Sequence, residues 1–226
     1  MTVRPGRSDG GIRKLAVTLH GPQNRSPAQR KWLLRQLNDP YVAAARAQKF
    51  RSRSAFKLIE LDESFRLIRK GARVVDLGAA PGGWSQVAAQ RGAANIVGVD
   101  LLPVEPVPGA TFIQGDFREP DMPLRLRDVL GGQADLVLSD MAPNTTGHAA
   151  TDHLRIVALA ELASVFAEEI LAPGGAFVAK VFQGGAERAM LASLKRCFVS
   201  VRHAKPPASR RESSELYVVA TQFRGG

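Results

Sequence analysis

The chain has 226 residues, of which 45% are hydrophobic and only one, Cys197, is cysteine. This length and composition suit one well-packed domain, and they exclude a disordered chain and a protein held together by internal disulfides. No apolar run approaches the roughly 18 residues that a membrane helix needs. The amino terminus is polar and basic, without the apolar core of a secretory signal. We therefore expect a cytoplasmic protein without a membrane partner.

The chain is strongly basic, with a formal net charge of +10 and a pI of about 10.5. Such an excess predicts a polyanionic partner, and it favours nucleic acid over a membrane surface. A basic surface that serves only solubility is the alternative, which composition alone leaves open.

The first 25 residues are rich in Gly, Pro, Arg and Ser, and they are predicted to form a mobile basic arm. Ser26 and Pro27 are the residue types that begin a helix, because the serine can cap it and proline suits the first turn. Asn38-Asp39-Pro40 then predicts the end of that helix.

We divide the chain into a basic N-terminal extension with one helix, 1–36, and a main domain, 37–226. Residues 41–69 begin the main domain with apolar residues at helical spacing. This predicted helical region also carries a basic cluster, which we expect to contact phosphates: Arg46, Lys49, Arg51 and Arg53.

From Arg73 onward, short β-branched runs alternate with amphipathic segments, which predicts a doubly wound α/β sheet. The predicted strands are 73–77, 95–100, 110–114, 134–139, 175–181, 198–204 and 215–222. The predicted helices are 84–91, 121–131, 152–171 and 185–196. Residues 205–214 show no helical pattern, so a hairpin should join the last two strands and make the final strand antiparallel. The sequence thus predicts a seven-stranded, mostly parallel sheet with helices on both faces.

The segment Asp76–Gln86, DLGAAPGGWSQ, lies between a predicted strand and a predicted helix. Its glycines let a ligand approach the backbone, and the helix start directs free N–H groups at that ligand. Asp100 ends the next predicted strand, where an acid in nucleotide-binding α/β folds binds ribose hydroxyls. The turn GAAPGG lacks the GxGxxG pattern and has proline where pyrophosphate would bind, so S-adenosylmethionine fits better than NAD. A glycine turn without a ligand is the alternative.

Four charged residues lie where this fold would gather them. Asp140 follows the fourth predicted strand and Lys180 lies near the end of the fifth, at the strand ends where open α/β sheets bind ligands. Glu215 begins the last strand, and Lys57 belongs to the helix before the first strand. A buried lysine beside a second cation can accept a proton from a hydroxyl group. Separate surface charges are the alternative.

From about Leu37 to Phe223, the sequence resembles the FtsJ-type ribosomal RNA 2′-O-ribose methyltransferases. The resemblance lies in Tyr41 and in a series of segments in the same order, which are RSRSAFKL (51–58), DLGAAPGGWSQ (76–86), VDLLP (99–103), QGDF (114–117), SDMAPNTTG (139–147), KVFQG (180–184) and KPPASRRESSELYVVA (205–220). It implies a Rossmann-like fold of the kind that uses S-adenosylmethionine.

The resemblance also implies roles for single residues. A catalytic Lys-Asp-Lys-Glu tetrad falls on Lys57, Asp140, Lys180 and Glu215, with Lys180 as the general base for a ribose 2′-hydroxyl. Lys57 and Glu215 would position the hydroxyl, and Asp140 would touch both the cofactor and a lysine. The implied cofactor contacts are Gly82 and Trp84 at the methionine end, Asp100 at the ribose and Asp116 at the adenine amino group. No metal is implied.

The substrate implied by the resemblance is a uridine in the A-loop of 23S rRNA, methylated within the large ribosomal subunit late in 50S assembly. Related members of the family act on tRNA or on mRNA caps, and these substrates remain alternatives. An RNA-binding assembly factor without catalysis is a further alternative, and a nicotinamide oxidoreductase is disfavoured by the glycine turn. A monomer is the default expectation for the oligomeric state.

Overall fold

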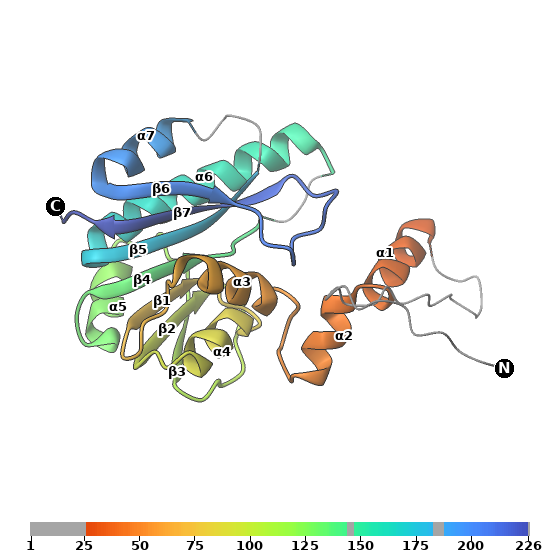
Figure 1. Cartoon of the computed structure of the whole chain (residues 1–226), viewed down its shortest axis with the longest axis horizontal. Coiled ribbons are helices and arrows are strands. Elements are labelled where there is room, and N and C mark those ends of the chain that lie inside the picture. The colour runs from red at the N-terminus through yellow and green to blue at the C-terminus, as the bar shows by residue number, and fades with distance from the viewer. Residues whose placement is uncertain (1–25, 144–146, 183–187, 226) are drawn as a thin grey trace, which may run out of the picture.

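The computed structural model describes residues 26–143, 147–182 and 188–225, so the predicted arm of residues 1–25 lies outside the described residues. All seven predicted strands are present (Figure 1), as β1 Arg73–Leu77, β2 Asn95–Asp100, β3 Ala110–Gln114, β4 Ala134–Ser139, β5 Leu171–Phe182, β6 Phe198–Ala204 and β7 Glu215–Phe223. Their β-branched and apolar runs suit a sheet that is covered on both faces.

The seven strands form one sheet in the order β3-β2-β1-β4-β5-β7-β6. The first five in this order pair in parallel, whereas β7 lies antiparallel between β5 and β6. The predicted hairpin of β6 and β7 and the antiparallel final strand are therefore confirmed. The hairpin folds back so that β7, and not β6, contacts β5.

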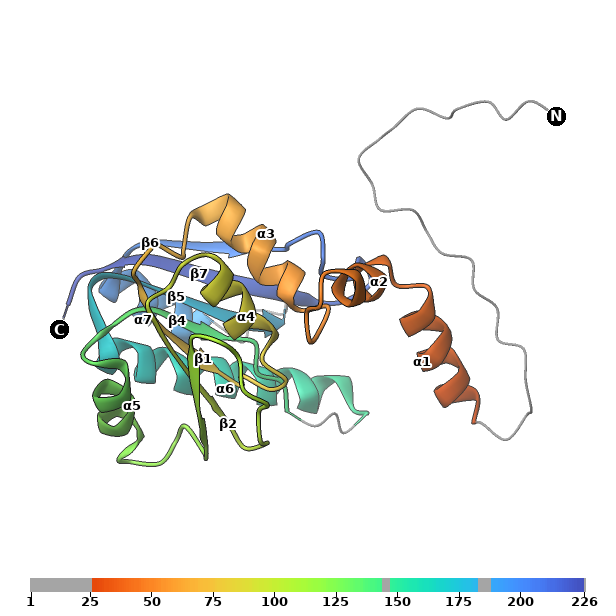
Figure 2. The same cartoon turned by 90° about the horizontal axis from the view of Figure 1, so that it is seen from below.

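Helices cover both faces of the sheet, as predicted (Figure 2). One face packs against α3 Ala55–Phe65 and α4 Gly83–Gln90. The other face packs against α5 Met122–Leu130, α6 Ala149–Ile170 and α7 Arg188–Cys197. None of the helices in the described part of the chain is long and apolar enough to cross a membrane.

Alternation along the strands supplies both hydrophobic cores. In β1, Val74 packs with the α3–α4 side, and its neighbour Val75 packs with the α5–α7 side. Successive side chains of a strand point to opposite faces, so a continuous apolar run fills two cores at once. This is why apolar residues occupy consecutive positions in these strands instead of alternating with polar ones.

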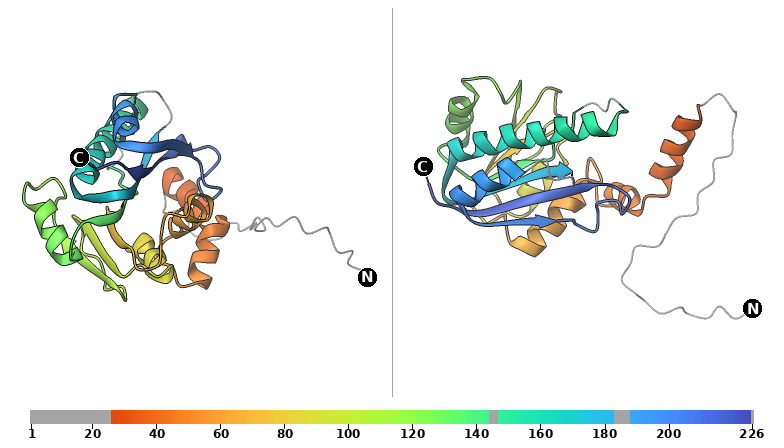
Figure 3. Two further views of the ribbon diagram at one scale, coloured as in Figure 1. Left: turned by 60° about the vertical axis from the view of Figure 1, so that its left-hand side comes forward. Right: turned by 90° about the horizontal axis from the view of Figure 1, so that it is seen from above.

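Two helices precede the sheet, α1 Pro27–Leu37 and α2 Pro40–Ala47. Ser26 caps α1 in a reciprocal pair with Gln29, and Asp39 caps α2, which explains the break at Asn38-Asp39-Pro40. Figures 1 and 3 show both helices beyond the end of the sheet that is remote from the carboxyl terminus. This is the end towards which the parallel strands run.

Gly98, at the centre of β2, should tolerate no side chain. A Cβ atom there would lie 2.5 Å from the Phe112 ring and 2.8 Å from the Ala79 Cβ. We expect Gly98→Ala to lower the free energy of unfolding by about 1–3 kcal/mol, because overpacking strains the core. Urea titration measures this loss. Gly115→Ala is the control, because its nearest neighbour is the flexible end of Met122 at 3.3 Å. Equal stability of the two variants would contradict the expectation.

Candidate active site

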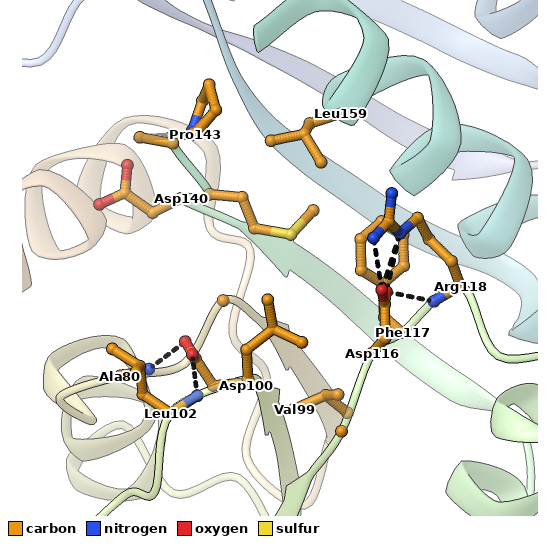
Figure 4. Close-up of a pocket in the computed structure, with 15 residues that line it drawn as sticks. Ala80, Val99, Asp100, Leu102, Asp116, Phe117, Arg118, Asp140, Pro143 and Leu159 are labelled. Carbon is orange, nitrogen blue, oxygen red and sulfur yellow. Dashed lines mark hydrogen bonds and ion pairs between the residues drawn. The ribbon is translucent and has the colours of Figure 1, made fainter. Parts of the chain in front are cut away.

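A cavity of about 590 Å³ opens where the parallel strands end. It is lined by residues at or just after the ends of β1, β2, β3 and β4, together with Leu159 of α6 (Figure 4). Three acidic residues are among those that line it, Asp100, Asp116 and Asp140. The cavity has the size of a small-molecule site and the position that open α/β sheets use for ligands.

Asp100 is held at the end of β2 by backbone N–H groups. Its Oδ2 accepts a hydrogen bond from Ala80 N at 2.8 Å, and its Oδ1 accepts one from Leu102 N at 2.9 Å (Figure 4). These bonds fix the carboxylate at the mouth of the glycine turn. Its remaining acceptor capacity faces the cavity, where it suits hydroxyl donors.

The glycine turn brings backbone close to the cavity. Gly78 lines it with a φ of 76°, in the left-handed region that glycine adopts at little cost. A Cβ atom on Gly78 would lie 2.5 Å from the Met141 Cγ. Just before it, the Asp76 carboxylate accepts a hydrogen bond from the Ser85 hydroxyl at 2.8 Å, and burial raises its pKa to about 7.

Arg51, which does not line the cavity, binds the backbone of the same turn. Its guanidinium donates to the backbone oxygen atoms of Pro81 at 3.1 Å, Glu105 at 2.5 Å and Pro106 at 2.6 Å. It thereby ties the glycine turn to the loop after β2. These bonds use three of the five N–H donors of the guanidinium within the protein.

The four residues of the predicted tetrad come together from four elements. Lys57 Nζ of α3 lies 2.7 Å from Glu215 Oε1 of β7 and 3.9 Å from Asp140 Oδ1. Lys180 Nζ of β5 lies 3.2 Å from the same Asp140 oxygen and donates to the Asp140 backbone oxygen at 2.6 Å. Both lysines are buried. Asp140 joins this cluster to the cavity, because it also lines the latter.

Asp140 is ionised within the cluster. Its burial would raise the pKa of the carboxyl, but the two lysines and the hydrogen bonds that it accepts outweigh this and hold the pKa below its usual value. The cluster therefore combines a fixed negative charge with two amines at the edge of the cavity. In such a cluster a lysine amine can accept a proton from a hydroxyl group, and the carboxylate stabilises the ammonium ion that results.

Tyr217 is a member of the cluster that the sequence reasoning missed. Its hydroxyl donates to Asp140 Oδ1 at 2.6 Å and lies 3.5 Å from Glu215 Oε1. The side chain is buried, and burial raises the pKa of the phenol well above its usual value, so it remains a donor. A signal was present, since Tyr217 lies two residues after Glu215 and therefore on the same face of the strand.

Gly82 and Trp84, predicted at the methionine end of the cofactor, are not among the residues that line this cavity. Trp84 is buried; its indole N–H donates to Ser54 O at 2.8 Å, and its ring lies 5.8 Å from that of Tyr217. Gly82 has a φ of 101°, and a Cβ on it would lie 2.9 Å from Arg51 Nη1. Both residues shape the turn, and their contact with a cofactor stays a prediction.

The predicted phosphate-binding cluster divides into two pairs. Arg51 is committed to the glycine turn, and Arg53 pairs with Asp39 at 3.0 Å and donates to Ala208 O. Arg46 and Lys49 are exposed and remain candidates. Two of the four predicted phosphate-binding side chains, Arg51 and Arg53, thus bond to carboxylate and carbonyl groups of the protein itself. Within the described residues, no group of three His, Cys, Asp or Glu side chains could hold a metal ion.

Known proteins of similar sequence are described as ribosomal RNA large subunit methyltransferase E. The protein of that description from Granulibacter bethesdensis is 70% identical over 95% of this chain and 93% of its own length. The one from Gluconobacter oxydans is 63% identical over 97% of this chain and 85% of its own length.

A solved structure and a family model agree with these relatives. The structure, described as a ribosomal RNA methyltransferase from Plasmodium falciparum, has a TM-score of 0.69 and 31% identity, covering 78% of this chain and 100% of its own. The model of the FtsJ-like methyltransferases matches residues 50–223. This range includes the glycine turn, the three cavity carboxylates and all four residues of the tetrad, and the chain belongs to the FtsJ-like methyltransferase family.

Proposed function

We propose that this protein transfers the methyl group of S-adenosylmethionine to a ribose 2′-hydroxyl in large-subunit ribosomal RNA. The observation that carries the proposal is the cluster of Lys57, Asp140, Lys180 and Glu215, which meets the cavity at Asp140. The relatives' descriptions support ribosomal RNA as the substrate. The target within it is proposed to be a uridine of the A-loop in 23S rRNA, methylated late in 50S assembly in the cytoplasm.

The cavity fits the proposed cofactor in size and in chemistry. Its volume of about 590 Å³ lies within the range of small-molecule sites. Asp100 suits the ribose hydroxyls and Asp116 suits the adenine amino group, because carboxylates accept from such donors. Gly78 admits close approach to the backbone, and Gly82 and Trp84 are proposed for the methionine end. When bound, S-adenosylmethionine supplies an electrophilic methyl group on its sulfonium.

In this proposal each residue of the cluster has its own role. Lys180 Nζ accepts the proton of the 2′-hydroxyl, and Asp140, at 3.2 Å, stabilises the ammonium ion that results. Lys57, held by Glu215 at 2.7 Å, positions the hydroxyl. Holding the acceptor oxygen in line with its target supplies much of the rate acceleration.

The RNA is proposed to bind at the end of the sheet where α1 and α2 lie. The exposed basic side chains there include Arg30 and Arg35 of α1, Arg46 of α2, and Lys49. Together with the net charge of +10, they supply the attraction to phosphates that RNA binding needs. An unpaired nucleotide could present its ribose to Lys180, as single-stranded loops do in many RNA complexes.

A methyl-transfer assay tests the proposal. Labelled S-adenosylmethionine is offered with unmethylated large ribosomal subunits, with bulk tRNA or with capped mRNA, and the label is mapped. Label on one ribose of the large-subunit RNA supports the proposal. Label on tRNA or on a cap keeps the chemistry and overturns the substrate. Binding of the cofactor without transfer to any RNA would instead favour an assembly factor without catalysis.

Tyr217→Phe tests whether the Tyr217 hydroxyl holds Asp140 in place for methyl transfer. The change removes the hydroxyl that donates to Asp140 at 2.6 Å and leaves the ring in place. We expect the single-turnover rate to fall about tenfold, since a hydrogen bond to a charged group contributes on the order of 1.5 kcal/mol. Tyr41→Phe is the matched control, because its hydroxyl donates to Glu60, outside the cluster. Equal rates in Tyr217→Phe and the wild type would contradict this role.

A further inference from the structure

The Asp116 carboxylate, one wall of the cavity, is bonded from one side by a single residue. Arg118 donates to it with its backbone N–H at 3.0 Å to Oδ1, with Nε at 2.8 Å to Oδ1 and 2.9 Å to Oδ2, and with Nη2 at 2.5 Å to Oδ2 (Figure 4). The Arg118 side chain itself also lines the cavity. The tripeptide from Asp116 to Arg118 therefore forms a closed unit at the cavity wall.

This unit leaves room for one more donor. The contacts use three protons, because Nε carries one proton that the two carboxylate oxygens share. An ionised carboxylate offers about four acceptor sites. One site therefore remains for a donor from the cavity, and Arg118 need not leave when that donor arrives.

The unit is also anchored from behind. The Phe117 ring is buried and packs edge to face against Phe166, with ring centroids 6.1 Å apart. The backbone closes a short turn, because Asp116 N donates to Glu119 Oε1 at 3.2 Å and Glu119 N donates to Asp116 O at 3.0 Å. Asp116 and Arg118 thus project from a turn whose backbone is held in place.

We propose that Arg118 is a positioning residue for cofactor selection. It holds the Asp116 carboxylate in one orientation, so that the free acceptor site receives an exocyclic amino group. A carboxylate accepts from the amino group of adenine but repels the carbonyl oxygen that hypoxanthine carries in the same place. The site therefore selects adenine over hypoxanthine. This inference rests on the proposed function, because it takes S-adenosylmethionine as the ligand of the cavity.

The acceptor site left on Asp116 argues against the alternative that Arg118 only blocks access of the cofactor to this carboxylate. A blocking arginine would have to be displaced by adenine, and its removal would tighten binding. A positioning arginine reduces the freedom that the carboxylate loses on binding, and its removal weakens binding. The two readings predict opposite signs for one substitution.

The test is calorimetric titration with S-adenosylhomocysteine and with S-inosylhomocysteine, which carries a carbonyl oxygen in place of the amine. The wild type should prefer the adenine ligand. Arg118→Ala should weaken adenine-ligand binding about tenfold and lower the preference ratio, because charge-assisted bonds orient the acceptor. Arg118→Lys, with one point donor, should restore part of the ratio. Arg196→Ala is the control, since Arg196 lies on α7 and its side chain bonds to Ser193, away from this turn.

The outcomes separate the inference from the function on which it rests. If the wild type binds neither ligand, the proposed cofactor fails. If the wild type binds but shows no preference for adenine, or if Arg118→Ala binds as tightly or more tightly, the role of Arg118 is overturned. An equal loss for both ligands, with an altered melting temperature, would mean that Arg118 only stabilises the turn, which also overturns it.

Discussion

Lys180→Met is expected to lower the single-turnover rate of methyl transfer about a thousandfold, which lies within the usual contribution of a general base. Methionine keeps an unbranched side chain of similar length and removes the amine, so the buried site stays filled. The lost groups are the amine at 3.2 Å from Asp140 Oδ1 and its bond to the Asp140 backbone oxygen. The rate is measured with saturating enzyme and labelled cofactor on the substrate found in the transfer assay.

Two controls accompany this variant. Lys195→Met removes an exposed amine on α7 and should leave the rate unchanged. The affinity for S-adenosylhomocysteine should stay close to that of the wild type in Lys180→Met, because Lys180 is not among the residues that line the cavity. If Lys180→Met keeps most of the wild-type rate, Lys180 is not the general base. A loss of cofactor affinity would assign it to binding.

Asp76→Asn is expected to change how stability depends on pH. Burial raises the pKa of Asp76 from 3.8 to about 7 in the folded protein. Between these two values the folded protein holds a proton that the unfolded chain releases. The stability contribution is therefore full below the unfolded pKa, is lost as the pH rises through the folded pKa, and levels off above it.

The size of this effect follows from the shift in pKa. Between about pH 5 and about pH 8, the wild type should lose roughly 3 kcal/mol of unfolding free energy through Asp76, since one pKa unit corresponds to about 1.4 kcal/mol. Asp76→Asn should lack this loss, because asparagine does not titrate and can still accept from the Ser85 hydroxyl. Any cost of the substitution that is independent of pH cancels in the comparison of slopes.

Urea unfolding at a series of pH values measures both slopes. Asp121→Asn is the matched control, because its carboxylate is 63% exposed, and it should follow the wild type. Parallel curves for Asp76→Asn and the wild type would show that the buried carboxyl does not titrate in this range. A steeper fall in the variant would have the wrong sign for a carboxyl whose pKa is raised.

Local patterns in the sequence were sufficient to place most of the elements. The strands β1, β2, β3, β4 and β6 begin and end where they were predicted, because a buried strand needs a continuous β-branched or apolar run. The ends of the longer elements were less accurate. The predicted helix 152–171 begins at Ala149, and β5 begins at Leu171 instead of residue 175. The turn signal Pro173-Gly174-Gly175 lies inside β5 and not between the helix and the strand, so the local pattern does not mark the boundary.

The sequence by itself identified the acids and the lysines of the site. The glycine turn, Asp100 at the end of the second strand and the charged residues near the ends of the other strands could be predicted from spacing, since parallel strands present their carboxyl ends at one edge. The resemblance to a family then assigned Lys57, Asp140, Lys180 and Glu215 to one cluster. The tertiary structure brings these four side chains within ion-pair distance of one another.

Only the tertiary structure decided which partner each charged group has. The placement of β7 between β5 and β6 sets Tyr217 opposite Lys180 and adds a hydroxyl to the cluster. Arg51 and Arg53 were expected to bind phosphates, yet they bond to carbonyl groups and to Asp39. Strand order and ion pairing depend on contacts between residues far apart in the chain, which the spacing of neighbouring residues does not encode.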